Sequence, residues 1–220
     1  MRGGKPPITH KGNYPAEIQQ FEQTLRQQGY QRIAGIDEAG RGALAGPVVA
    51  AAVILPTDCQ LSGVTDSKQL TPKKRAELFD EIHRTAVAVG VGCVDNKEID
   101  QINILQATMT AMVQAIVQIT PAPDYALVDG THLPAISLPR LHRDSEQPAR
   151  AIPKGDTLIQ SIAAASIIAK VTRDRLMIEL DETYPGYSFR VHKGYGTLLH
   201  RQAIAQLGPC PIHRRSFKLQ

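Results

Sequence analysis

The sequence has few cysteines, and their arrangement suggests neither a disulfide framework nor a metal site. Cys59, Cys93 and Cys210 are odd in number and widely spaced. Scattered cysteines are typical of a reducing compartment, so we expect a cytoplasmic protein. No stretch approaches the roughly 20 apolar residues that cross a bilayer. No apolar segment follows the first residues, so the sequence predicts neither a secretory signal nor a membrane protein.

Acidic residues are missing from one part of the chain, residues 183–220. Its basic residues are six in number: Arg190, Lys193, Arg201, Arg214, Arg215 and Lys218. When these are taken from the 25 basic residues of the whole chain, residues 1–182 hold 19 basic against 21 acidic side chains, a net charge of −2. A basic segment beside a slightly acidic body suits a polyanionic partner, and a solvated basic face explains it equally well.

Hydrophobic spacing predicts one mixed α/β domain with about five strands, opened by an antiparallel hairpin. Strands are expected at 32–37, 48–55, 86–94 and 125–129. A first helix is expected after Pro15, and a second after Thr71-Pro72, with Ala76, Phe79 and Ile82 facing inward. A third is expected at 99–116. The last two are expected from a capping Asp156 to about Glu182 and from Thr197 to Gly208. Residues 1–14 are expected to be a polar arm, and 131–154 mostly loop.

We divide the chain into three parts on this basis. Residues 1–31 form an N-terminal extension with a short helix, and residues 32–182 form the core. Residues 183–220 form a basic C-terminal region that packs on the core.

Carboxylates follow the ends of two predicted core strands. Asp37 and Glu38 end the first strand, and Asp129 ends another just before a glycine. Side chains alternate between the faces of a regular strand, but at a strand end that becomes a glycine-rich turn both acids can converge. A further acid, Asp174, shares a helical stripe with Ser166 and Lys170. Taken singly, Asp129 is also explained by a turn and Asp174 by a surface ion pair.

Several partly desolvated acids repel one another, which is tolerable if they hold divalent cations. Oxygen ligands without a Cys/His spacing favour Mg²⁺ or Mn²⁺ over Zn²⁺. Two such ions can clamp the attacking water and the leaving oxygen of a phosphodiester. The acids therefore predict a two-metal phosphodiesterase site, provided that they meet in space.

The segment Gly40-Arg41-Gly42 places a cation and flexible backbone just beyond the acidic pair. Glycines let backbone N–H groups approach a ligand closely, so the loop could hold phosphate or sugar oxygens. A tight hairpin turn explains the same residues. The spacing fits neither a P-loop nor a dinucleotide-binding loop.

Further candidates for substrate contact are polar residues outside the acidic segments. Lys68, before the Thr71 cap, could donate to a phosphate, as could Arg214 and Arg215. Tyr195, between two glycines, could stack on a sugar or base and sense a 2′-hydroxyl, the group that separates RNA from DNA. Each residue also has a purely structural explanation. Lys68 could belong to a helix entry, the two arginines to a solvated tail, and Tyr195 could pack beneath a loop.

The order of these segments resembles bacterial ribonuclease HII, the type 2 ribonuclease H. The matching segments are 35–42 (GIDEAGRG), 66–68 (DSK), 128–130 (VDG), 154–156 (KGD), 163–174 (AAASIIAKVTRD), 192–197 (HKGYGT) and 213–217 (HRRSF). They cover the chain from about residue 32 to 217. The first and the longest are highly specific, whereas DSK and VDG alone would be weak.

This resemblance implies a ribonuclease H-like fold with a helical C-terminal region and cleavage of RNA in RNA–DNA hybrids, including single ribonucleotides embedded in duplex DNA. It implies Mg²⁺ or Mn²⁺, with 5′-phosphate and 3′-hydroxyl products. It matches the four metal-site carboxylates to Asp37, Glu38, Asp129 and Asp174. It matches the groups that recognise the 2′-hydroxyl to Gly40, Arg41, Gly42 and Tyr195.

Two departures from the family pattern are the residues before Arg32 and an apparent insertion at 137–150. Neither touches a matched segment. We expect a monomer without membrane contact that binds RNA–DNA hybrid and ribonucleotide-containing duplex. A ribonuclease H-fold DNA nuclease and a hybrid-binding module without catalysis are the alternatives. The Tyr195 loop argues against the first, and the set of acids against the second.

Overall fold

A computed structural model of the chain describes residues 16–57, 59, 61–136, 138 and 148–219. Its centre is a five-stranded mixed sheet in the order β3-β2-β1-β4-β5. The strands are β1 (Ile33–Ala39), β2 (Val48–Ile54), β3 (Ala88–Val94), β4 (Tyr125–Asp129) and β5 (Ala149–Ile152). β1 and β2 form the predicted antiparallel hairpin, while β4 and β5 run parallel to β1. The predicted α/β fold with a mixed five-stranded sheet is therefore confirmed.

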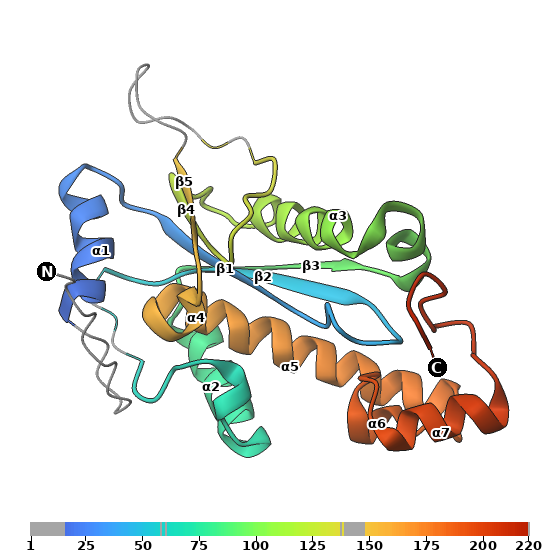
Figure 1. Ribbon diagram of the computed structural model, residues 1–220. Helices are drawn as coiled ribbons and strands as arrows, with labels where there is room; N and C mark the ends of the chain where they lie inside the picture. The colour runs from blue at the N-terminus through green and yellow to red at the C-terminus, as the bar shows by residue number, and fades with distance from the viewer. Residues whose placement is uncertain (1–15, 58, 60, 137, 139–147, 220) are drawn as a thin grey trace, which may run out of the picture.

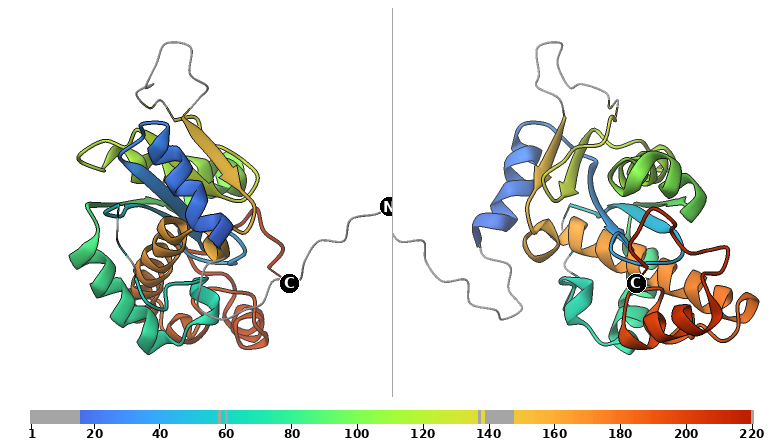
Figure 2. Two further views of the ribbon diagram at one scale, coloured as in Figure 1. Left: turned by 90° about the vertical axis from the view of Figure 1, so that its left-hand side faces the viewer. Right: turned by 45° about the vertical axis from the view of Figure 1, so that its right-hand side comes forward.

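Helices cover both faces of this sheet. α3 (Asn96–Val117) packs on β2 and β3, and the opposite face holds α5 (Gln160–Thr183), against which α2 (Pro72–Thr85) packs (Figure 1). α1 (Ala16–Gln27) lies beside the sheet at the end away from α6 (Phe189–His192) and α7 (Leu198–Leu207), which pack near the end of α5. Figure 2 shows the layers from two further sides. No helix of the described residues is long and apolar enough to cross a membrane.

Small residues in the strands let the helices approach the sheet closely. Every residue of β2, whose sequence is VVAAAVI, is buried. A Cβ atom on Gly35 of β1 would lie 2.1 Å from the carbonyl carbon of Ser161 in α5. On the other face, a Cβ on Gly92 of β3 would lie 1.9 Å from the carbonyl oxygen of Ala111 in α3. The backbone of α5 is therefore held directly against β1, the strand that carries the acidic pair.

Helix ends follow the polar residues that the sequence offers. The Thr71 hydroxyl accepts a hydrogen bond from the backbone N–H of Lys74, and the Thr197 hydroxyl accepts one from His200, which are standard N-terminal caps. α3 is kinked at Asn103, whose φ is 68°, and the side chain of Asn103 accepts from the N–H groups of Leu105 and Gln106. These bonds cap the second part of the helix.

Several predicted element boundaries were wrong. β1 continues past the acidic pair to Ala39, because its pairing with β2 extends that far. β5 lies within the segment expected to be mostly loop, and Leu78 rather than the exposed Ala76 is buried on α2. Asp156 does not cap the long helix. It lies inside a separate short helix, α4 (Gly155–Leu158), and the extended Ile159 separates α4 from α5.

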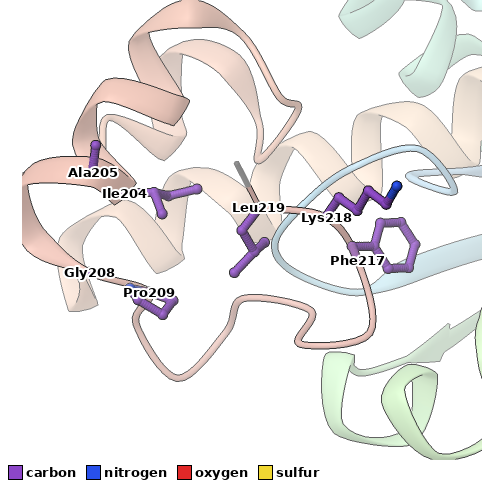
Figure 3. A pocket seen from close by; sticks show the side chains of 7 residues that line it. All are labelled: Ile204, Ala205, Gly208, Pro209, Phe217, Lys218 and Leu219. Carbon is purple, nitrogen blue, oxygen red and sulfur yellow. The ribbon is translucent and has the colours of Figure 1, made fainter.

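The predicted arm at 1–14 and most of the predicted insertion at 137–150 lie outside the described residues. Beyond α7, the described C-terminal tail forms one wall of a pocket of about 590 Å³, lined by Ile204, Ala205, Gly208, Pro209, Phe217, Lys218 and Leu219 (Figure 3). None of the predicted site residues lines it, so the functional site is sought elsewhere.

Because the backbone of α5 lies against Gly35, we expect Gly35→Ala to destabilise the protein. The added methyl group cannot be placed without moving a strand or a helix, and overpacking of this kind costs about 1–3 kcal/mol. Urea denaturation would measure the loss. Gly42→Ala is the matched control, since a Cβ at Gly42 meets no atom within 4 Å, and its stability should stay within about 0.5 kcal/mol of wild type. Equal stability of the two variants would contradict the expectation.

Candidate active site

Three of the predicted carboxylates come together at one edge of the sheet. β1 and β4 are parallel, and Ile36 pairs with Val128, so Asp37 and Asp129 follow at the same level. The carboxyl ends of parallel strands are the usual site of function in α/β sheets. Asp37 is 5% exposed, its side chain accepts a hydrogen bond from the Glu38 N–H, and the Ser166 hydroxyl lies beside it and acts to lower its pKa. Glu38 is half-buried beside it.

Each of the first two acids is harder to ionise than a free carboxyl group. Burial, followed by the negative charges of Glu38 and Asp129, raises the pKa of Asp37 well above its usual value. Burial also raises the pKa of Glu38, Arg41 opposes this shift, and Asp129 adds to it. Such mutual repulsion marks a functional-site candidate, because a cation would relieve it.

A fourth carboxylate near this group is Asp156, which the sequence analysis assigned to a helix cap. Burial, then the charges of Asp129 and Asp66, raises the pKa of Asp156 to about 6. The N–H of the preceding Gly155 donates to Asp129 Oδ1 over 2.7 Å, which fixes α4 against the end of β4. Lys68 faces the same group: burial acts to lower its pKa, but Asp66, Asp156, Asp37 and Asp129 together raise it.

Asp174, the predicted fourth metal ligand, forms an ion pair with Lys170 in the structure, and its role as a ligand stays a prediction. Its Oδ1 accepts a hydrogen bond from Lys170 Nζ over 2.7 Å. The helix rises about 1.5 Å per residue, so Asp174 lies about 12 Å along α5 from Ser166, which contacts Asp37. The shared stripe on α5 is real, but only its Ser166 end reaches the acids.

Gly40 and Gly42 lack side chains for different reasons. Gly40 has a φ of +98°, and a Cβ there would lie 2.0 Å from Arg173 Nε, so the protein itself requires glycine. Gly42 is exposed, and a Cβ there would meet nothing within 4 Å. Between them, Arg41 donates to Glu38 Oε1 over 3.2 Å, which links the loop to the acidic pair.

Tyr195 lies next to this loop although it comes from the C-terminal region. Its backbone forms an isolated antiparallel bridge with Ala43. Lys170 Nζ and the guanidinium carbon of Arg173 lie 5.4 and 5.3 Å from the centre of its ring. The structure thus brings the half-buried Tyr195 and the Gly-Arg-Gly segment together.

Comparison with known proteins agrees with this geometry. The ribonuclease HII family model matches residues 34–220. Ribonuclease HII of Geotalea uraniireducens is 57% identical over 90% of this chain and 88% of its own. That of Geobacter sulfurreducens is 58% identical over 90% and 87%. The chain belongs to the ribonuclease HII family. It is therefore an endonuclease of a family that cleaves the RNA of RNA–DNA hybrids.

A solved structure shows the same fold. The ribonuclease H2 of Pyrococcus horikoshii OT3 superposes on this ribonuclease HII chain with a TM-score of 0.66 at 30% identity, over 86% of this chain and 94% of the other.

The two neighbouring arginines that we expected to contact phosphate have different surroundings in this chain. Arg215 is exposed, and its backbone N–H donates to Asp100. Arg214 is 0% exposed and donates to backbone carbonyls, and its predicted contact with phosphate stays a prediction. Lys68 and Lys170 remain near the acids and Tyr195 respectively.

The sequence analysis did not select two residues that lie beside predicted site residues, Asp156 near Asp129 and the buried Arg173 against Tyr195. Asp156 had a signal in the sequence, since it follows a short segment with alternating apolar residues that proves to be β5. β5 is parallel to β4 with Asp129 opposite Ile152, so an acid just beyond its end comes to the same edge. No sequence signal distinguished Arg173 from an exposed arginine.

The geometry predicts different results for substitutions of Asp156 and of Asp174. Asp156→Asn should lower cleavage of an RNA–DNA hybrid at least 100-fold, because it removes a carboxylate from the acidic group. Asp174→Asn should keep activity within about tenfold, since Asp174 is paired with Lys170 away from the acids. Initial rates at saturating Mg²⁺ or Mn²⁺ would measure both. The reverse ranking would restore Asp174 to the site.

Stability without divalent metal should also report on Asp156. A carboxyl group whose pKa is raised in the folded state favours folding when it is protonated. For Asp156 this contribution is lost as the pH rises from 3.8, the pKa in the unfolded chain, through about 6, the pKa in the folded protein. We therefore expect Asp156→Asn to melt at a higher temperature than wild type at pH 8 in EDTA, and the difference to shrink toward pH 4. A difference independent of pH would argue against a repelled carboxylate.

Proposed function

We propose that this protein hydrolyses the RNA strand of RNA–DNA hybrids and cuts at single ribonucleotides embedded in duplex DNA, by two-metal-ion catalysis. The products would carry 5′-phosphate and 3′-hydroxyl ends. The observation that supports this most is the position of four mutually repelling carboxylates beside a loop with open space at Gly42 and beside Tyr195. The acids suit metal-dependent hydrolysis, and the loop and tyrosine suit recognition of a ribose.

The acids offer only hard oxygen ligands, which fit Mg²⁺ or Mn²⁺. Asp37, Glu38, Asp129 and Asp156 would hold the ions. Within the described ranges no three His, Cys, Asp or Glu side chains already surround one point. Mg²⁺ needs no such cage, because it commonly binds through one or two carboxylates and keeps several waters. Bound ions would supply charge stabilisation for the attacking and leaving oxygens.

Arg41 can change partner when substrate binds. Its guanidinium is half-exposed and forms an ion pair with Glu38. Because the Arg41 end of this pair is open to solvent, the guanidinium has room to move away from Glu38. Arg41 would then contact a phosphate, while Glu38 is freed for metal. Lys68, whose pKa is raised by the charges of four nearby acids, would remain close to the same group.

Gly42 and Tyr195 would read the sugar. The open space at Gly42 lets a ribose approach the loop backbone, whose N–H and C=O groups can hydrogen-bond a 2′-hydroxyl. Tyr195 has an aromatic hydroxyl, and Lys170 and Arg173 both lie close to its ring. A contact that only a ribose completes distinguishes it from deoxyribose, because the protein groups stay unpaired otherwise. We further propose that the protein acts as a monomer.

A duplex DNA with one embedded ribonucleotide tests this proposal directly. We expect one cut at the ribonucleotide with Mg²⁺ or Mn²⁺, no cut in the all-DNA duplex, and loss of at least 100-fold for Asp37→Asn. Cleavage of all-DNA duplex would favour a DNA nuclease. Tight binding of hybrid without cleavage, even with Mn²⁺, would favour a binding module.

The open position at Gly42 leads to a separate prediction. Gly42→Ala should lower cleavage at the embedded ribonucleotide about 10- to 100-fold, because the methyl group occupies space that we assign to the ribose. Steady-state rates on the one-ribonucleotide duplex would measure the loss, with thermal melting as the control for folding. Unchanged rates would show that the ribose does not approach the loop there.

A further inference from the structure

Two arginines of this protein are buried without an acidic partner. Arg173 and Arg214 are each 0% exposed. Neither takes part in any ion pair found among the described residues. A buried guanidinium is costly unless its donors find acceptors, so such residues need a structural or functional reason. Their side chains must therefore be satisfied in another way.

Both guanidiniums donate to backbone carbonyls of one segment, which we call the 40–47 loop. Arg173 Nε donates to Pro47 O over 2.8 Å, and its Nη2 donates to Ala45 O over 3.1 Å. Arg214 donates to Gly46 O, Arg41 O and Pro47 O over 3.0, 2.9 and 3.1 Å. The loop that begins with the Gly-Arg-Gly segment is thus held by hydrogen bonds from two buried side chains that come from distant parts of the chain.

The same two residues connect this loop to the Tyr195 segment. Arg173 Nη1 donates to Lys193 O over 2.9 Å, and its guanidinium lies against the Tyr195 ring. Leu44 N donates to Gly194 O over 2.8 Å, and Arg214 N donates to Leu44 O over 2.9 Å. Both arginines therefore donate hydrogen bonds to the loop. Arg173 also contacts the C-terminal region, and Arg214 is part of that region.

The segments around Arg173 are tightly packed. A Cβ at Gly40 would lie 2.0 Å from Arg173 Nε, and a Cβ at Gly194 would lie 2.5 Å from Ala45 O. Both glycines have positive φ. The two segments consequently fit together in one arrangement, with the guanidinium between them. A lysine could reach one carbonyl but not reproduce the planar set of donors.

We propose that Arg173 and Arg214 are positioning residues for ribose recognition, which fix Gly42 and Tyr195 relative to each other as one rigid unit. Neither would touch the substrate. The inference rests on the proposed function, because it assigns a purpose to the distance between the two groups that read the sugar. A single embedded ribonucleotide can bind in only one register, so it depends on that distance more than a continuous RNA strand does.

The experiment compares Arg173→Lys and Arg214→Lys with wild type on two substrates, a duplex DNA with one ribonucleotide and a continuous RNA–DNA hybrid. We expect kcat/KM to fall about 100-fold on the first and about tenfold or less on the second, mostly in kcat, because misplacement of about 1 Å can cost 10²-fold. Arg175→Lys is the matched control. Arg175 lies on the same helix, but it is exposed and lies over the Phe79 ring instead.

A double-variant cycle distinguishes a positioning role of Arg173 from a merely structural one. If Arg173 acts through Tyr195, Arg173→Lys should cost less than about threefold on the one-ribonucleotide duplex once Tyr195→Ala is present. Independent, multiplicative losses would overturn the inference. So would equal losses on the two substrates.

Folding and the proposed function are checked in the same experiment. Thermal melting shows whether the lysine variants fold, and if Arg173→Lys does not, Arg214→Lys carries the comparison. If neither folds, the pair serves folding and the inference is wrong. Wild-type protein that cuts the hybrid but not the embedded ribonucleotide would refute the proposed specificity together with this inference. Wild type that cuts both, with variants that keep its ratio, would refute this inference alone.

Discussion

The parallel register of β1 and β4 places Asp37 level with Asp129, and much of the surrounding structure offsets the repulsion that results. The Glu38 N–H bonds Asp37, beside which the Ser166 hydroxyl lies, and the Gly155 N–H bonds Asp129. Hydrogen bonds to charged groups are each worth about 1.5–3 kcal/mol, enough to hold ionised acids in a folded protein but not to cancel burial. A divalent cation therefore gains binding free energy from charges that the fold has already brought together.

Helix α5 relates the two halves of the site. Ser166 reaches the acids, and Arg173, two turns later, reaches the 40–47 loop and Tyr195. Seven residues of helix span about 10 Å, so a single rigid element sets the separation between the acidic group and the proposed sugar contacts. Gly35, which lets α5 lie against β1, serves the same purpose, because it fixes the helix against the strand that carries Asp37.

Sequence patterns predicted those parts of the fold that depend on local chemistry. The apolar runs of β2 and β4, the caps at Thr71 and Thr197, and the hairpin all have local causes. β5 was missed because it is a four-residue, partly exposed strand whose pairing with β4 depends on distant residues. Without β5, nothing placed Asp156 at the acidic edge, and Asp174 was selected instead from its helical stripe and its match to the family pattern.

The two buried arginines were missed for a different reason. Arginine is almost always exposed, and Arg214 and Arg215 are chemically identical neighbours, so no local pattern shows which one is buried. The difference arises only when residues 212–214 lie against the 40–47 loop, which requires the whole chain to be folded.

Gly40 and Gly42 show how one short motif combines two kinds of constraint. The protein requires glycine at position 40, because the backbone is left-handed there and Arg173 occupies the space of a side chain. At position 42 it has no such requirement, since the residue is exposed and a Cβ would meet nothing. A glycine that the fold does not need, beside carboxylates that the fold barely tolerates, is best explained by a molecule that must approach from outside. In the proposed function Gly42 would thus mark the side from which substrate approaches, and Gly40, through Arg173, would help to keep Tyr195 in place there.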